Sequence, residues 1–93
     1  MPTANPAPTT SAANSTDITV TSAAPVNVGL YTAAGGALPG GVRAPLARKN
    51  PSGTYDKTGL ELTSQVPNLT ITGAGVYRVE KPATTVAVGV STD

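Results

Sequence analysis

The sequence contains no cysteine, no histidine, no tryptophan and no phenylalanine, and each absence excludes a class of structure or chemistry. Without cysteine, the chain forms no disulfide bond and offers no thiolate ligand or thiol nucleophile. Without histidine, it lacks the side chain that most often acts as a general base near neutral pH. Because its only aromatic residues are three tyrosines, its core must be built from Val, Leu, Ile and Ala.

Charged side chains are also scarce, at 12% of 93 residues, and the formal net charge is +1. A nucleic-acid-binding protein needs clustered Lys and Arg to neutralise phosphates, so we expect no nucleic acid partner. The acids are scattered along the chain at Asp17, Asp56, Glu61, Glu80 and Asp93. A domain this small cannot enclose a substrate in a deep cleft. We therefore expect no enzymatic activity, no small-molecule substrate, no metal site and no cofactor.

Long hydrophobic runs are missing as well. No apolar run approaches the ~20 residues that span a bilayer, so we expect no membrane association. The N-terminal sequence MPTANPAP has neither the basic start nor the apolar stretch of a signal peptide. We expect the chain to be made in the cytoplasm and to be used without Sec export.

The stretch from Val66 to Val90 carries the strongest pattern in the chain. Its apolar residues lie close to a period of two, which predicts strands with one buried and one exposed face. Gly73-Ala74-Gly75 allows the chain to reverse between a first strand and a return strand. The last strand, Thr84 to Ser91, has valines on one face and only Ala87 and Gly89 on the other, so another segment has room to pack closely there.

Similar patterns upstream predict strands at Ile18 to Thr21 and Val26 to Tyr31, a short edge strand at Leu46 to Asn50, and a strand from Gly59 to Thr63. The count is six or seven strands with no helix. This pattern predicts an all-β fold, a small antiparallel β-sandwich of immunoglobulin-like or jelly-roll-like type.

Tyr77, at the start of the return strand, lies two residues after Gly75. This placement resembles the tyrosine corner of immunoglobulin-like sandwiches. The alternative is a half-buried tyrosine at an ordinary strand start.

Residues 1–16 contain no charged side chain and no hydrophobic period, so they cannot form a core of their own. We divide the chain into an extended N-terminal arm, residues 1–16, and a β-sandwich domain, residues 17–93. An arm of this composition is mobile unless it is tied down, and a neighbouring subunit is the expected means, with a chance packing contact as the alternative. The candidate partner-binding residues in the arm are Pro2, Thr3, Asn5, Pro6 and Pro8.

Two further features are candidates for binding. The Gly-rich stretch from Thr32 to Pro45 lacks the ending and the following helix of a phosphate-binding loop, so we expect a long connection, with a binding loop as the alternative. Arg43, Arg48 and Lys49 form the only basic cluster. A solvated surface is the default interpretation, and docking onto an acidic partner surface is the alternative.

The segments NPSGTYDKTGLELTS and LTITGAGVYRVEKPATTVAVGVSTD, which lie within Asn50 to Asp93, resemble the C-terminal region of small β-rich virion proteins of tailed bacteriophages. Those proteins decorate or cement the capsid. The similarity is a turn before an aromatic residue and a Gly-x-Tyr-Arg-Val return strand; here the turn is Ser52-Gly53 instead of an Asp-Gly type.

The resemblance implies a homo-oligomeric sandwich on the capsid surface that bridges neighbouring major capsid protein subunits or other virion proteins. The alternative is a carbohydrate- or receptor-binding module of a phage fibre or cell-surface protein. Such a module needs aromatic platforms or a polar pocket, and the chain offers only Tyr31, Tyr55 and Tyr77 as platforms.

Overall fold

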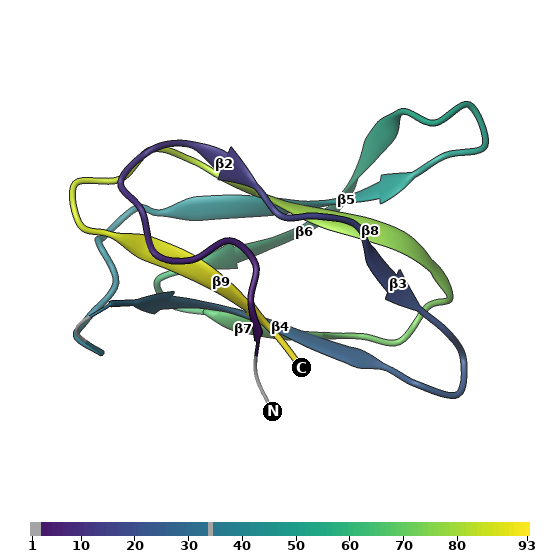
Figure 1. Ribbon diagram of the computed structural model, residues 1–93, viewed down its shortest axis with the longest axis horizontal. Helices are drawn as coiled ribbons and strands as arrows, with labels where there is room; N and C mark the ends of the chain where they lie inside the picture. The colour runs from purple at the N-terminus through teal and green to yellow at the C-terminus, as the bar shows by residue number, and fades with distance from the viewer. Residues whose placement is uncertain (1–2, 34) are drawn as a thin grey trace.

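A computed structural model describes residues 3–33 and 35–93 of the chain. Every regular element among these residues is a β-strand, and the strands form two antiparallel sheets packed face to face (Figure 1). The prediction of a small all-β sandwich is confirmed. Pro2, one of the predicted partner-binding residues, lies outside the described residues.

The first sheet has the order β1-β9-β4-β7, and we call it the β4 sheet. Its strands are β1 (Thr3–Ala4), β9 (Val88–Thr92), β4 (Val26–Thr32) and β7 (Asn68–Ile71). The second, the β5 sheet, has the order β2-β8-β5-β6, and β3 also pairs with β8. Its strands are β2 (Ala13–Asn14), β8 (Gly75–Lys81), β5 (Arg43–Lys49), β6 (Tyr55–Thr63) and β3 (Ile18–Val20).

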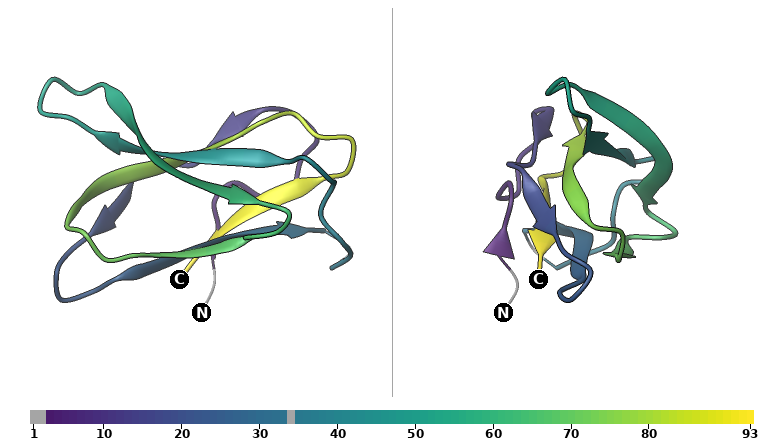
Figure 2. Two further views of the ribbon diagram at one scale, coloured as in Figure 1. Left: turned by 180° about the vertical axis from the view of Figure 1, so that it is seen from behind. Right: turned by 90° about the vertical axis from the view of Figure 1, so that its right-hand side faces the viewer.

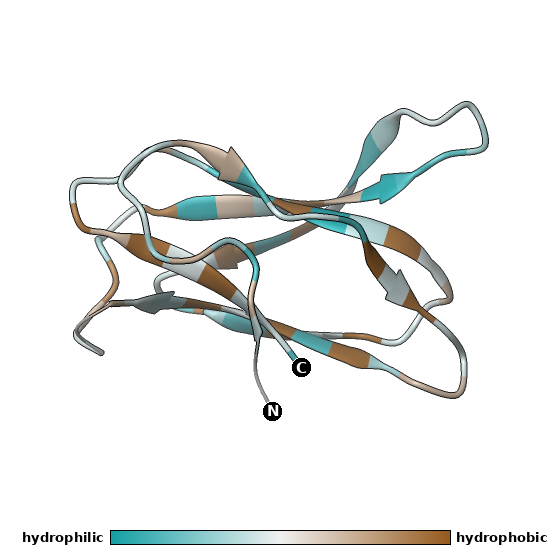
Figure 3. Cartoon of the chain, viewed as in Figure 1, coloured by the Kyte–Doolittle hydropathy of each residue, from teal (hydrophilic) through white to brown (hydrophobic). Residues whose placement is uncertain are grey.

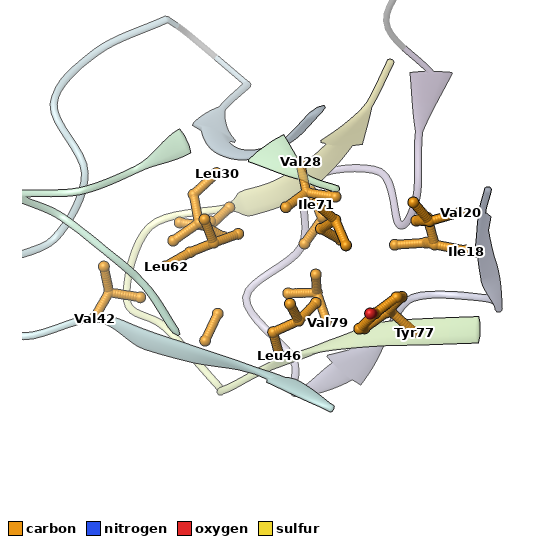
Figure 4. Packing of buried hydrophobic residues seen from close by; sticks show 13 residues of the cluster. Ile18, Val20, Val28, Leu30, Val42, Leu46, Leu62, Ile71, Tyr77 and Val79 are labelled. Carbon is orange, nitrogen blue, oxygen red and sulfur yellow. The ribbon is translucent and has the colours of Figure 1, made fainter. Parts of the chain in front are cut away.

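The core lies between the sheets and follows from the period of two. Hydrophobic and more polar residues alternate along the main strands (Figure 3), so the hydrophobic set of each strand faces the other sheet. The buried cluster, shown in Figure 4, comprises Ile18, Val20, Val28, Leu30, Val42, Ala44, Leu46, Leu62, Ile71, Tyr77, Val79, Val88 and Val90. No described residue before Ile18 belongs to this cluster.

Tyr77 forms the predicted tyrosine corner. Its hydroxyl group donates a hydrogen bond to the carbonyl oxygen of Gly73, at 2.9 Å, and its ring is buried in the core. The expected reversal at residues 73–75 has a different form from a hairpin, because β7 belongs to the β4 sheet and β8 to the β5 sheet. The turn therefore carries the chain from one sheet to the other, as a tyrosine corner does.

The prediction of a short edge strand at Leu46 to Asn50 is wrong. β5 begins earlier, at Arg43, and is a central strand with β6 on one side and β8 on the other. Its polar end, which resembles an edge in sequence, belongs to a β5–β6 hairpin that projects beyond the rest of the molecule (Figure 1). Because β5 starts at Arg43, the predicted loop from Thr32 to Pro45 is shorter than expected.

The N-terminal arm lies along one side of the sandwich and pairs with this chain's own strands (Figures 1 and 2). Residues 3–9, which we call the strap, run beside β9. Residues 11–15, the anchor segment, return beside β8, where they lead into β3. The described part of the arm thus pairs with strands of its own sandwich.

Candidate functional site

Charge is divided unequally between the two sheets. The strands of the β4 sheet contain no charged residue. Apart from Asp93, which follows β9, every charged residue of the chain lies within β5, β6 or β8 or, as Asp17 does, directly before β3. The outer surface of the β4 sheet is therefore built from neutral side chains except at one end, where Asp93 pairs with Asn27 through two backbone hydrogen bonds, at 2.8 and 3.0 Å.

This surface, which we call the neutral face, comprises Asn27, Gly29, Tyr31, Asn68, Thr70 and Ser91. Its polar groups bond across strands, since the Thr70 hydroxyl donates to Asn27 Oδ1 at 2.6 Å. Gly29 lies at its centre, where a Cβ would lie 3.2 Å from Ser91 Oγ and even closer to Asn68 Oδ1, so a larger residue would displace the Asn68 side chain. The amide of Asn68 thus lies close to the backbone of β4 at Gly29.

Tyr31 is the one large side chain on the neutral face. It is half-buried and lines an open hollow of about 420 Å³ together with Thr3, Ala4 and Ser91. Its phenol makes no hydrogen bond within the part of the chain that the structure describes. Tyr31 therefore offers both ring surface and a free hydroxyl group to a partner.

The outer surface of the β5 sheet is charged and internally paired. The Arg78 guanidinium lies 3.9 Å from the centre of the Tyr55 ring, so it covers one face of that ring. The Tyr55 hydroxyl donates to Asp17 Oδ1, and the Lys49 ammonium lies 3.5 Å from Asp17 Oδ2. Tyr55 is thus committed to the fold, as is the buried Tyr77, and neither provides a free aromatic platform.

Glu80 is the second carboxylate of this surface. It lies between the Lys57 ammonium, at 2.9 Å, and the Arg78 guanidinium, whose closer nitrogen is 2.7 Å away. Hydrogen bonds from Lys57 and Arg78 hold the pKa of Glu80 below its usual value. The hydrogen bond from Tyr55 likewise lowers the pKa of Asp17, with a further contribution from Lys49, and raises the pKa of the Tyr55 phenol.

These shifts predict that acid destabilises the fold. A carboxyl group whose pKa is lower in the folded state contributes stability above its unfolded pKa and loses it as the pH falls toward the folded value. The free energy of unfolding, measured by urea titration, is therefore expected to fall as the pH drops below 4.5, the ordinary pKa of a glutamate such as Glu80. Glu80→Gln and Asp17→Asn should each reduce this acid-dependent loss. An unchanged loss in both variants would contradict the assignment.

The described candidate residues of the arm lie on this chain's own β9. Thr3 pairs with Thr92. The backbone N–H of Asn5 donates to the carbonyl oxygen of Val90, and the carbonyl oxygen of Pro6 accepts from the Val90 N–H. Pro8 packs against Gly89, the small position that the sequence singled out: a Cβ at Gly89 would lie 2.8 Å from the Pro8 nitrogen.

The predicted basic cluster is not one patch. Arg43 is five positions from Arg48 along β5, a separation of about 17 Å at ~3.4 Å per residue. Arg43 bonds to Glu61 through Nε and a terminal nitrogen, at 3.0 and 2.6 Å. Lys49 pairs with Asp17, whereas Arg48 donates to the carbonyl oxygen of Ala74, at 3.1 Å. Arg48 also lines an open hollow of about 830 Å³ beside the projecting hairpin.

The sequence analysis missed two residues of the anchor region. Ser15 is buried, its N–H donates to the carbonyl oxygen of Val79, and its hydroxyl accepts from the Val79 N–H, both at 2.8 Å. Lys81 is 2% exposed, and its ammonium donates to the carbonyl oxygens of Ser11, at 2.7 Å, and Pro82, at 3.0 Å. Burial lowers the pKa of this ammonium. The period of two does place Lys81 on the inner face with Tyr77 and Val79, which is the signal that could have found it.

No family model, curated protein or solved structure matches this chain. Among the described residues, no group of three or more acidic, His or Cys side chains is placed to hold a metal ion. The same part of the chain contains no helix that is long and apolar enough to cross a membrane.

Proposed function

We propose that this chain is a structural virion protein that decorates and stabilises a phage capsid by bridging neighbouring major capsid protein subunits. The observation that supports this proposal most strongly is the neutral face. The resemblance of residues within Asn50 to Asp93 to capsid decoration proteins supplies the identity of the partner.

The chemistry of protein interfaces explains why the neutral face is the docking surface. The centre of a stable interface is depleted of charged residues and enriched in tyrosine, because a buried charge must be desolvated. The neutral face meets this condition around its anchor Tyr31, and its charged neighbour, Asp93, lies at the end of the face beside Asn27. The β5 sheet does not, since the ion pairs on its outer surface would lose their hydration on docking.

Repetition of the copies over the shell makes their attachment strong. A single face of this size makes a weak or moderate contact, but the copies on a symmetric shell bind together, and linked weak contacts give a strong attachment. The paired strands of the β4 sheet fix the backbone of the neutral face, so little conformational entropy is lost on binding.

Tyr31→Ala is expected to weaken binding to purified phage heads that lack this protein by about tenfold or more, the effect of removing an aromatic anchor. Binding is measured by co-sedimentation. Lys57→Ala is the matched control, because it changes an exposed side chain on the opposite sheet and should bind as the unmodified protein does. Equal binding by Tyr31→Ala, or a loss confined to Lys57→Ala, would overturn the proposed docking face.

The second candidate is a carbohydrate- or receptor-binding module, and Tyr31 is the observation that favours it. Sugar rings pack on exposed aromatic rings, and the hydroxyl and amide groups around Tyr31 are suited to a neutral, hydroxyl-rich ligand. A glycan array separates the candidates. Glycan binding that Tyr31→Ala abolishes, without binding to heads, would replace the capsid proposal.

A further inference from the structure

The strap occupies a strand-accepting edge. The N–H and carbonyl groups of Val90 bond to Pro6 and Asn5, and those of Val88 both bond to Thr9, with donor–acceptor distances of 2.6 to 3.1 Å. On its other side β9 pairs with β4. Without the strap, β9 would therefore be an open edge, which is a template for another strand.

The strap seat, which we define as the edge of β9 from Val88 to Thr92, has a shape as well as a hydrogen-bonding pattern. Gly89 is buried, and a Cβ there would lie 2.9 Å from the carbonyl oxygen of Pro6 and 2.8 Å from the nitrogen of Pro8. Only a glycine allows the strap to approach this closely. The strap seat thus fits a strand that approaches β9 as closely as Pro6 and Pro8 do.

The strap itself adds nothing to the core. None of residues 3–9 is buried, and none belongs to the buried cluster. The side chains of the strap also carry no charge. Its attachment includes backbone hydrogen bonds to β9, the fit at Gly89, and the acceptance by Asn5 Oδ1 of bonds from Thr16. The carbonyl oxygen of Thr9 also accepts a bond from the Thr84 hydroxyl, at 3.5 Å.

The anchor segment, by contrast, is firmly fixed. Lys81 holds the Ser11 carbonyl, β2 pairs with β8, and the buried Ser15 bonds to Val79. A strap released from β9 would therefore remain tethered at Ser11. The nine residues 3–11 span about 30 Å when extended, at ~3.3 Å per residue. The sandwich measures 35 × 26 × 20 Å, so this length reaches a neighbour packed at its side.

We propose that the strap of one copy occupies the strap seat of a second copy, with Thr10 as the hinge. The same hydrogen bonds form between copies as within one, so exchange costs little once copies are crowded together. This inference deepens the proposed function, on which it rests for its purpose: exchanged straps would link decorating copies to one another. Its partner is specified by sequence, because a second copy supplies the strap that fits Gly89.

Disulfide trapping tests the exchange in isolated protein, and the absence of native cysteine makes any bond unambiguous. Thr3→Cys is placed in a copy with a large tag, and Thr92→Cys in an untagged copy. Thr3 and Thr92 are register partners, and such Cα atoms lie ~4.5–5.5 Å apart, which suits a disulfide. The copies are mixed at high concentration, incubated and oxidised, and we expect a covalent heterodimer on a non-reducing gel.

Three further variants make the result of the disulfide-trapping experiment decisive. The double variant with both cysteines in one chain should form an internal disulfide, which shows that the geometry is competent. An acceptor with Ser52→Cys, in the exposed turn of the projecting hairpin, gives the background of chance collision. Gly89→Val added to the Thr92→Cys acceptor should reduce linking to that background.

A competent double variant without heterodimer above background would overturn the exchange. So would heterodimer formation that Gly89→Val leaves unchanged, since the link would then not use the strap seat. Neither outcome bears on the neutral face, because no phage heads are present. Failure of head binding by the Tyr31→Ala criterion would in turn leave the exchange result standing.

Discussion

Leu62→Ala is expected to lower the free energy of unfolding by about 2–5 kcal/mol, the cost of truncating a fully buried leucine. Leu62 lies on β6, has no exposed surface and belongs to the core cluster between the sheets. At about 0.05–0.15 kcal/mol per residue, 93 residues give a total stability of about 5–14 kcal/mol. The substitution therefore removes a large fraction of that total. Urea denaturation followed by circular dichroism measures the loss.

The effect should be large because this core has few ways to compensate. It contains no Trp or Phe, and the chain has no disulfide. Leu60→Ala is the matched control: Leu60 lies two positions earlier on the same strand and is 54% exposed. Its truncation should change stability by less than about 0.5 kcal/mol. Similar losses in the two variants would mean that β6 is not placed with Leu62 inward.

Ser15→Ala is expected to cost about 1–3 kcal/mol, because it leaves the buried N–H of Val79 without an acceptor. The two residues are 64 positions apart in sequence, so this bond joins the arm to the middle of β8. Hydrogen exchange should show faster exchange at the Val79 amide. The unfolding transition should move to lower urea.

Ser11→Ala is the control for this substitution. Ser11 is an exposed serine of the same segment, and its bond to Lys81 uses the backbone carbonyl, which alanine keeps. Its stability should match that of the unmodified protein. If Ser15→Ala is equally silent, Ser15 does not fix the anchor segment, and the tether point assumed for strap exchange would have to move.

The strap and the neutral face give the two proposals a common physical basis, because each offers a contact surface to another protein. The neutral face provides one contact surface, on the β4 sheet, and the strap provides a second, at the edge of the same sheet. A chain with a small core and no disulfide gains stability from both kinds of contact, since binding to the folded state stabilises it by mass action. Assembly and folding would then support each other.

The sequence by itself determined the class of the fold and the inward-facing residues. The period of two in segments such as Val26 to Tyr31 requires strands, and the absence of any helical period excludes other classes. The spacing of Tyr77 after Gly75 predicted the tyrosine corner, which the Tyr77–Gly73 bond confirms. The small residue Gly89 predicted a close approach, and Pro8 makes it. The strand period and the tyrosine corner depend on neighbours within a few positions, which a sequence pattern records. The segment that approaches Gly89 comes from the other end of the chain, and the sequence did not identify it.

Pairing between distant strands was decided only by the tertiary structure. The pattern of residues 46–50 resembles an edge, yet β5 is central because β8, some thirty positions away, pairs with it. The arm has no hydrophobic period, so nothing local shows that β9 is its partner. The neutral face exists because three uncharged strands from separate parts of the chain lie together in one sheet. Hydrogen bonds and packing across the sandwich, and not local propensity, select these neighbours.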